Sequence, residues 1–124
     1  MIKKVVTLLA INIPLATLAE EYLCTHENGV SVSLIGAYTV EPPFAVESLS
    51  VDTESGVRWL PHWDYLGKCT LSQGYLGIDG VLCTWSGDGF IRELFINSDT
   101  LEHSYSVHAR GNGTSAYTGY CVKT

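Results

Sequence analysis

The clearest alternation of apolar and polar positions runs through residues 101–109. One face of this stretch is mostly apolar and the other polar, which is the period of two shown by a half-buried strand. Two apolar runs precede it at 80–85 and 90–97, each followed by turn-forming residues at 86–89 and 98–100. Together the three segments predict an antiparallel meander, which can form a stable sheet face. The apolar face of the last strand consists of Leu101, His103, Tyr105, Val107 and Ala109.

Shorter strand and turn signals surround this meander. Residues 20–25 and 30–34 lie on either side of Asn28-Gly29, a dipeptide that favours a tight turn, so we expect a hairpin there. The second strand is expected to bend near Gly36 and to stop at the two prolines at 42 and 43, because proline cannot donate to a sheet ladder.

Three further signals complete the chain. Residues 46–51 and 57–60 flank a turn, residues 74–82 form an expected hairpin through Asp79-Gly80, and residues 116–122 form a closing strand. We find no helical periodicity after the first 19 residues. About eight short strands with turns every 8 to 12 residues are typical of small β-proteins. The predicted fold is therefore all-β, a small antiparallel barrel or sandwich of about eight strands.

The first 19 residues differ from everything that follows. They begin with Met-Ile-Lys-Lys, continue with an apolar run over 5–15 and end in Ala16-Thr17-Leu18-Ala19, with small residues at the third and first positions before the expected cut. A positive start, a short apolar centre and small residues before a cut are the parts of a secretory signal peptide. The run is shorter than the roughly 20 apolar residues of a membrane anchor. We therefore expect a signal peptide at 1–19, a single β-domain at 20–124 and no membrane anchor after cleavage.

The expected mature chain is strongly acidic. It loses Lys3 and Lys4 with the leader, which leaves five basic residues against all 13 acidic ones and a net charge of −8. Such a surface repels phosphate backbones and anionic lipid heads, which argues against nucleic acid or charged membranes as partners. A basic protein is the expected partner, and the sequence carries no signal for an oligomeric state.

All four cysteines lie in the expected mature part. An even number in an exported domain of this size predicts two disulfides that staple the β-domain. Three pairings are possible. We favour Cys69 with Cys83, which closes a hairpin, and Cys24 with Cys121, which ties the first strand to the last. No Cys-x-x-Cys and no paired histidine spacing is present, so no metal site is predicted.

Two histidines and one serine are the candidates for catalysis. His103 lies on the apolar face of its strand, where it is either a structural histidine or the base of a small hydrolase with a nearby carboxylate. His108 falls on the opposite face, so the two cannot share a metal in a regular strand. Ser86 lies in a turn without the surroundings of a nucleophile elbow. The sequence therefore predicts no catalytic residue and no cofactor.

The most suggestive binding stretch is residues 59–65. It carries three large aromatic rings interrupted by a proline and flanked by polar groups. Such rings either anchor a sugar or protein partner or close an open end of the barrel. The binding residues predicted from this stretch are Trp59, His62, Trp63, Asp64 and Tyr65.

Several short motifs carry a resemblance. The motifs are Tyr22-x-Cys24, Gly67-Lys68-Cys69, Leu82-Cys83, Phe95-x-Asn97 with Leu101, Ser104-Tyr105 and Gly119-Tyr120-Cys121. With these motifs the chain resembles a loose group of small exported bacterial proteins with no assigned activity, and this likeness implies location and fold rather than a reaction. A fainter likeness is to the small periplasmic β-barrel inhibitors of c-type lysozyme, which also place a cysteine in the first strand and an acidic surface outward. The signature loops of those inhibitors are missing, so no residue is carried over.

These observations lead to two hypotheses of different class. The first is a non-enzymatic binding module, secreted or periplasmic, that acts as an inhibitor or immunity-like protein. Replacing Trp59 and Trp63 with alanine should then abolish partner capture and leave the fold intact. The second is a small extracytoplasmic hydrolase that uses His103. A purely structural role in the envelope has no distinguishing feature in the sequence.

Overall fold

A computed structural model describes residues 19–42, 44, 48–59, 64–75, 77–87, 89–111 and 113–124. The expected signal peptide, apart from Ala19, lies outside these ranges. Within them no helix has the length and hydropathy needed to cross a membrane. The regular elements are the strands β1 (Glu21–Ser33), β2 (Gly36–Val40), β3 (Ser48–Asp52), β4 (Gly56–Trp59), β5 (Lys68–Tyr75), β6 (Ile78–Gly87), β7 (Phe90–Asn97), β8 (Glu102–Ala109) and β9 (Gly113–Lys123).

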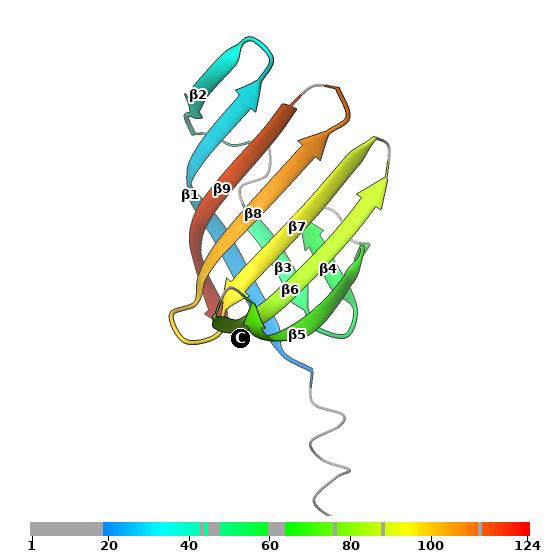
Figure 1. Cartoon of the computed structure of the whole chain (residues 1–124). Coiled ribbons are helices and arrows are strands. Elements are labelled where there is room, and N and C mark those ends of the chain that lie inside the picture. The colour runs from blue at the N-terminus through cyan, green and yellow to red at the C-terminus, as the bar shows by residue number, and fades with distance from the viewer. Residues whose placement is uncertain are drawn as a thin grey trace, which may run out of the picture.

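The strands form one antiparallel sheet that curls into a nearly closed barrel (Figure 1). Eight of them follow the order β4-β3-β1-β9-β8-β7-β6-β5, and β2 pairs with β1 beside this path. The two ends of the path meet where Val57 of β4 and Leu66, just before β5, exchange backbone hydrogen bonds of 2.9 and 2.8 Å. Closure gives the edge strands of the path a partner, whereas β2 is bonded on one side among the described residues.

The all-β prediction is confirmed, and so is the meander. Strands β6, β7 and β8 pair in sequence order, with Leu94 of β7 between Cys83 of β6 and Tyr105 of β8. Both favoured disulfides are present. Cys24 faces Cys121 directly across β1 and β9, and Cys69 faces Cys83 across β5 and β6.

The core fills the inside of the barrel because the strands of the eight-strand path turn alternate residues inward, whereas β2 has no buried residue. Fully buried aliphatic side chains come from opposite walls, namely Leu49 and Val51 of β3 and Leu94 and Ile96 of β7. Both disulfides lie within this cluster. The other members of the core are Tyr22, Cys24, Val57, Val81, Cys83, Trp85, Tyr105 and Cys121.

The hairpin expected at Asn28-Gly29 is wrong. β1 runs through this dipeptide without turning, because β9 pairs with the residues on both sides of it, and an irregularity between His26 and Asn28 absorbs one residue. Gly29 is needed for another reason: a Cβ there would lie 2.8 Å from a ring carbon of Tyr117. The turn lies instead at residues 34 and 35.

The second expected turn, Asp79-Gly80, lies three residues beyond the turn set by the pairing of Tyr75 with Ile78. The hairpin of β5 and β6 exists, but Asp79-Gly80 lies within β6, and Gly77 supplies the positive φ of 78°. Gly80 lies against β7, where a Cβ would approach the carbonyl oxygen of Ile96 to 2.2 Å. Close packing against the next strand therefore explains this glycine, rather than turn geometry.

Candidate functional site

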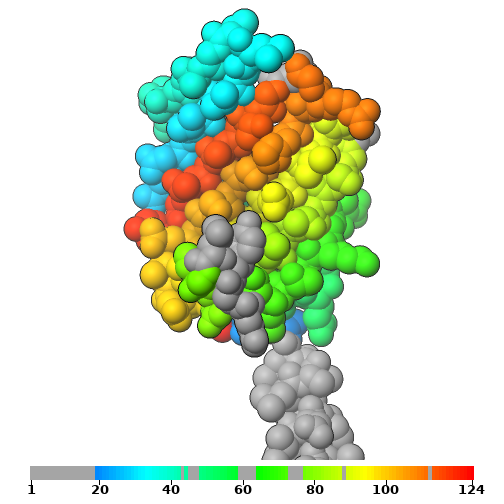
Figure 2. All heavy atoms as spheres, viewed as in Figure 1, coloured from blue at the N-terminus to red at the C-terminus, as the bar shows by residue number. Residues whose placement is uncertain are grey.

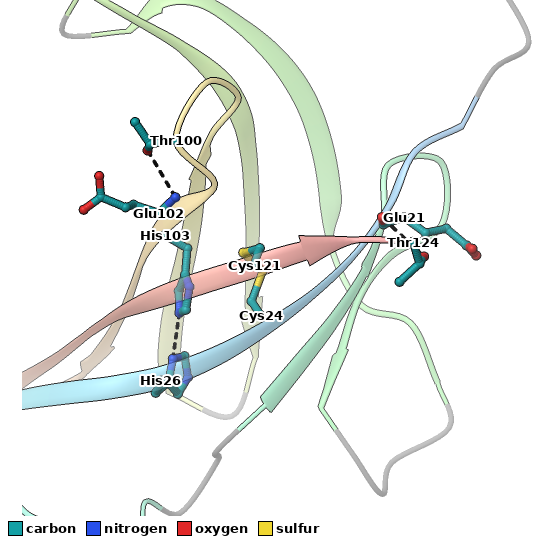
Figure 3. Close-up of a disulfide and its surroundings, with 8 residues drawn as sticks. All are labelled: Glu21, Cys24, His26, Thr100, Glu102, His103, Cys121 and Thr124. Atoms are coloured by element: carbon teal, nitrogen blue, oxygen red, sulfur yellow. Dashed lines mark hydrogen bonds between the residues drawn. A yellow bond between two sulfur atoms is a disulfide. The ribbon is translucent and has the colours of Figure 1, made fainter.

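Two histidines meet inside the barrel across a glycine. In the strand register Gly119 of β9 lies between His26 of β1 and His103 of β8. Because glycine has no side chain, the two imidazoles can approach each other over the middle strand. A Cβ on Gly119 would lie 2.9 Å from Cε1 of His103 and 2.0 Å from the carbonyl oxygen of Thr25. Figure 3 shows the two rings joined by their hydrogen bond.

The two histidines are buried and hydrogen-bonded to each other. His26 Nδ1 and His103 Nε2 are 2.9 Å apart, and the residues are 5% and 3% exposed. The other ring nitrogens, His26 Nε2 and His103 Nδ1, are buried and have no hydrogen-bond partner among the described residues. A neutral imidazole has one N–H and one lone pair. Whichever ring donates, the pair therefore leaves one buried N–H and one buried lone pair unmatched.

Burial also governs the charge of these rings. Desolvation lowers the pKa of His26 to about 4, and repulsion from His103 adds to this shift. Desolvation alone lowers the pKa of His103 to about 4. Both rings are therefore neutral at pH 7, because a charged imidazole in the barrel would lose its hydration without gaining a counter-ion.

Aromatic rings enclose one side of the pair. His26 stacks on Tyr105 and Tyr117 at centroid distances of 5.2 and 5.1 Å, and the ring of Phe44 meets it edge-on at 6.4 Å. The Cys24–Cys121 disulfide lies on the other side (Figure 3). These neighbours carry no negative charge at neutral pH, which is why no interaction offsets the desolvation of the imidazoles.

The hydrolase hypothesis needs a carboxylate beside His103. In the described part of the chain, His26 is the hydrogen-bond partner of Nε2, and Nδ1 has none. His108 behaves as expected from the alternation: it is exposed on the other face of β8, with Nδ1 at 3.0 Å from the hydroxyl of Thr114. The arrangement is therefore a pair of imidazoles joined by one hydrogen bond, rather than a base oriented by a carboxylate.

Part of the aromatic stretch predicted to bind a partner lies outside the described residues. His62 and Trp63 lie outside the described residues, as does the side chain of Trp59, whose backbone ends β4. Asp64 is exposed, and Tyr65 is half-buried with the guanidinium carbon of Arg58 at 4.8 Å from its ring centroid. The binding role of this stretch stays a prediction.

A surface that the sequence reasoning missed lies on the hairpin of β1 and β2. The hairpin projects beyond the rim of the barrel, as the cyan segment in Figure 2 shows. Its turn residues Leu34 and Ile35 are each 98% exposed. Of the twelve large hydrophobic side chains exposed among the described residues, five lie on this hairpin. These five are Val30, Val32, Leu34, Ile35 and Tyr38.

Acidic groups gather at the other end of the barrel, where β1 begins and the β3–β4 and β7–β8 turns lie. Glu21, Glu54, Asp99 and Glu102 are exposed there. Among the described cations, Lys123 reaches this end and makes an ion pair of 3.3 Å with Glu20. The apolar hairpin and the acidic end are thus separated along the barrel axis.

Comparisons with known proteins add no assignment. No family model, curated protein or solved structure matches the chain. The resemblances noted from the short motifs therefore remain expectations, and the function has to be argued from the chain's own residues.

Proposed function

We propose that the chain is an exported binding module that captures a basic protein and carries out no reaction of its own. The observation that carries this proposal is the β1–β2 hairpin with its two fully presented apolar residues, Leu34 and Ile35. An isolated exposed leucine is ordinary on a protein surface, but a continuous apolar area beside it is typical of interaction sites. Here Val30 and Val32 continue the apolar area along β1.

The edge of β2 supports the same proposal. Natural sheets usually protect an edge strand with charges, a proline or a bulge. β2 has the sequence Gly-Ala-Tyr-Thr-Val, which contains none of the charged residues or prolines that protect an edge, and most of its residues are exposed. Such an edge can pair with an extended segment of a partner while the apolar side chains fix the register.

Charge supports a basic partner. The expected mature chain has a net charge of −8, and four of its exposed carboxylates lie at the end of the barrel opposite the hairpin, those of Glu21, Glu54, Asp99 and Glu102. A field of one sign steers an oppositely charged protein and speeds its association, whereas the apolar contact determines how long it stays. The hairpin and the acidic end therefore have separate effects on binding.

Two observations support export. The two disulfides fit an oxidising environment outside the cytoplasm, and residues 1–19 have the pattern of a signal peptide. We assign the mature domain to the periplasm or the medium.

The test uses the oxidised chain of residues 20–124 as bait in envelope and culture extracts. A basic protein should be captured, and once purified it should bind the bait directly with an affinity that falls at high salt. Leu34→Ser with Ile35→Ser should abolish this binding. The matched control is Leu71→Ser, which removes an exposed leucine from β5, away from the hairpin. Equal binding by both variants would rule out the hairpin as the contact surface, and a captured protein without basic character would overturn the proposal.

A third variant separates the hairpin from the aromatic stretch. If residues 59–65 form the contact instead, Trp59→Ala with Trp63→Ala should abolish binding while the hairpin variant binds normally. That outcome would support a binding module whose contact surface is residues 59–65 rather than the hairpin. Loss in both variants would indicate that the partner spans the two regions.

A further inference from the structure

The inner face of three neighbouring strands brings sulfur and nitrogen donor atoms into one small volume. One ring nitrogen of His103 and the Sγ atoms of Cys24 and Cys121 all lie within 4.8 Å of one another, and all three residues are buried. His26 adds a second imidazole, 2.9 Å from the first. In the folded, oxidised protein the two sulfurs are bonded to each other and have no thiolate to offer.

We propose that reduction of the Cys24–Cys121 bond turns this cluster into a binding site for zinc or a similar thiophilic divalent cation. Cys24, Cys121 and His103 are the core ligands, and His26 completes a set of four. This site does not involve the hairpin surface, so its test is independent of the binding function proposed above.

The donor set matches the chemistry of such a cation. Two thiolates and two imidazoles in tetrahedral arrangement form one of the common structural zinc sites, with ligand bonds of about 2.0 to 2.3 Å. The three core donor atoms lie within 4.8 Å of one another, so they have to move somewhat closer to reach the separations of such a site. His26 would have to turn from its hydrogen bond with His103 toward the cation. The cysteines face each other directly on paired strands, which keeps both sulfurs near one point after the bond is broken.

The unmatched nitrogens give a second, independent indication of a ligand. His26 Nε2 and His103 Nδ1 are unpaired within residues that are more than nine-tenths buried, so the pair retains an unused lone pair inside the barrel. A buried polar group without a partner is costly unless something binds it. Gly119 keeps the space over the middle strand open for both rings. A cation bound to one imidazole would use this lone pair, and ligation by the second imidazole would replace the hydrogen bond between the two rings.

The redox step needs an external dithiol. The dithiol becomes a disulfide and supplies two electrons and two protons, while the Cys24–Cys121 bond breaks into two thiols. Binding of Zn²⁺ then displaces the two thiol protons, because the thiolate is the ligand. An oxidising disulfide reverses this: it takes two electrons from the thiolates and two protons from water, re-forms the Cys24–Cys121 bond and releases the cation.

Cation binding and disulfide formation therefore compete for the same two sulfurs. A newly made chain carries free thiols before any oxidant acts on it, so the cation site can exist before the disulfide does. A bound cation would protect both thiols from oxidation, and the disulfide would exclude the cation. Cys24 and Cys121 would then be held together either by their disulfide or by the bound cation, but not by both.

The test is a titration with Co²⁺, which reports tetrahedral thiolate ligation by its visible and near-ultraviolet bands. Cys69→Ala with Cys83→Ala removes the other disulfide, and a phosphine reduces the one that remains. One equivalent of Co²⁺ should give the bands, Zn²⁺ should abolish them, and the oxidised protein should show none. His103→Ala should weaken binding at least about tenfold, a loss typical of damage to a metal site, whereas His108→Ala should not change it.

The reciprocal variant is the matched control. Cys24→Ala with Cys121→Ala keeps two thiols and both histidines, yet it should give no tetrahedral bands. Equal bands in this variant would overturn the proposal, as would a reduced, folded protein that gives none.

A measurement on the unchanged cysteine set covers the case in which the first variant does not fold. The reduced chain of residues 20–124 is alkylated with and without Zn²⁺, and the labelled peptides are identified by mass. Zn²⁺ should protect Cys24 and Cys121 and leave Cys69 and Cys83 reactive. Equal labelling of all four cysteines in the presence of Zn²⁺ would refute the site.

Discussion

The lower part of β1, residues 21–26, and its upper part, residues 28–33, differ in the strands that flank them. Below the irregularity that follows His26, the strand lies between β3 and β9, and Tyr22, Cys24 and His26 point into the core. Above it, β1 lies between β9 and β2, and most of its side chains are exposed. Contacts that stabilise the fold are concentrated in the lower part, so the upper part is free to present apolar residues to a partner. The predictions below test this division.

Acid should produce the largest loss of stability, through the histidine pair of the oxidised protein. An imidazole in the unfolded chain takes up a proton near pH 6.5, whereas in the folded barrel the pKa of His26 and that of His103 are lowered to about 4. Between these values the unfolded state binds more protons. Stability should therefore be complete above pH 6.5 and fall as the pH drops to 4, by about 3 kcal/mol for each imidazole.

Urea unfolding between pH 8 and pH 4 measures this loss. His103→Asn should make the pH dependence shallower, whereas His108→Asn, which changes an exposed histidine on the same strand, should leave it unchanged. Glu20 contributes at lower pH only, because a hydrogen bond from the Tyr22 hydroxyl lowers the pKa of its carboxyl. A flat profile from pH 6.5 to 4 would contradict the role given to the buried pair.

Removing the central disulfide should have the next largest effect. Cys24→Ala with Cys121→Ala opens a loop with a sequence separation of 97, against 14 for Cys69 and Cys83. In the chain-entropy model the costs are about 4.7 and about 3 kcal/mol. Denaturant midpoints of the two double variants compare them directly. If the Cys69–Cys83 pair proved the more important one, stability would not be concentrated where β1 meets β9.

Gly119 tests whether the histidines need the open space between them. Gly119→Ala places a Cβ against the backbone of β1 and the ring of His103, so we expect a loss of about 3 kcal/mol, at the upper end for overpacked sites. Gly87→Ala is the matched control, since a Cβ there meets nothing within 4 Å. Its unfolding free energy should change by less than about 0.5 kcal/mol. Equal stability of the two variants would show that the barrel yields easily at this level.

The sequence predicted the fold well because inward and outward residues alternate cleanly along the meander. His103 was placed on the buried face for this reason, and both disulfides followed from hairpin and strand order. The same alternation contains the signal for His26, since Tyr22, Cys24 and His26 occupy every second position. The turn preference of Asn28-Gly29 concealed it. Pairing of β1 with β9 over a long register overrides that local preference.

Two features of the site depend on contacts between distant segments and have no local signal. Gly119 is one of twelve glycines, and only the register of β1, β9 and β8 shows that it separates two histidines. The exposed tip at Leu34 and Ile35 was missed because Leu34 continues the alternation of Val30 and Val32, which predicts one strand that bends near Gly36 rather than a turn at 34 and 35. Its exposure follows from the length of β1, which extends beyond the barrel.

The smallest effect on stability is expected at this tip, and two leucines make the comparison direct. Leu94 is fully buried on β7, so Leu94→Ala should cost about 2 to 5 kcal/mol through lost burial and the cavity left behind. Leu34 is almost fully exposed, so Leu34→Ala should change the unfolding free energy by less than about 0.5 kcal/mol. Chemical denaturation of both variants gives the two values. A loss above 1 kcal/mol at Leu34 would mean that the hairpin packs against the barrel, and a surface that contributes to folding in this way would be a weaker candidate for binding a partner.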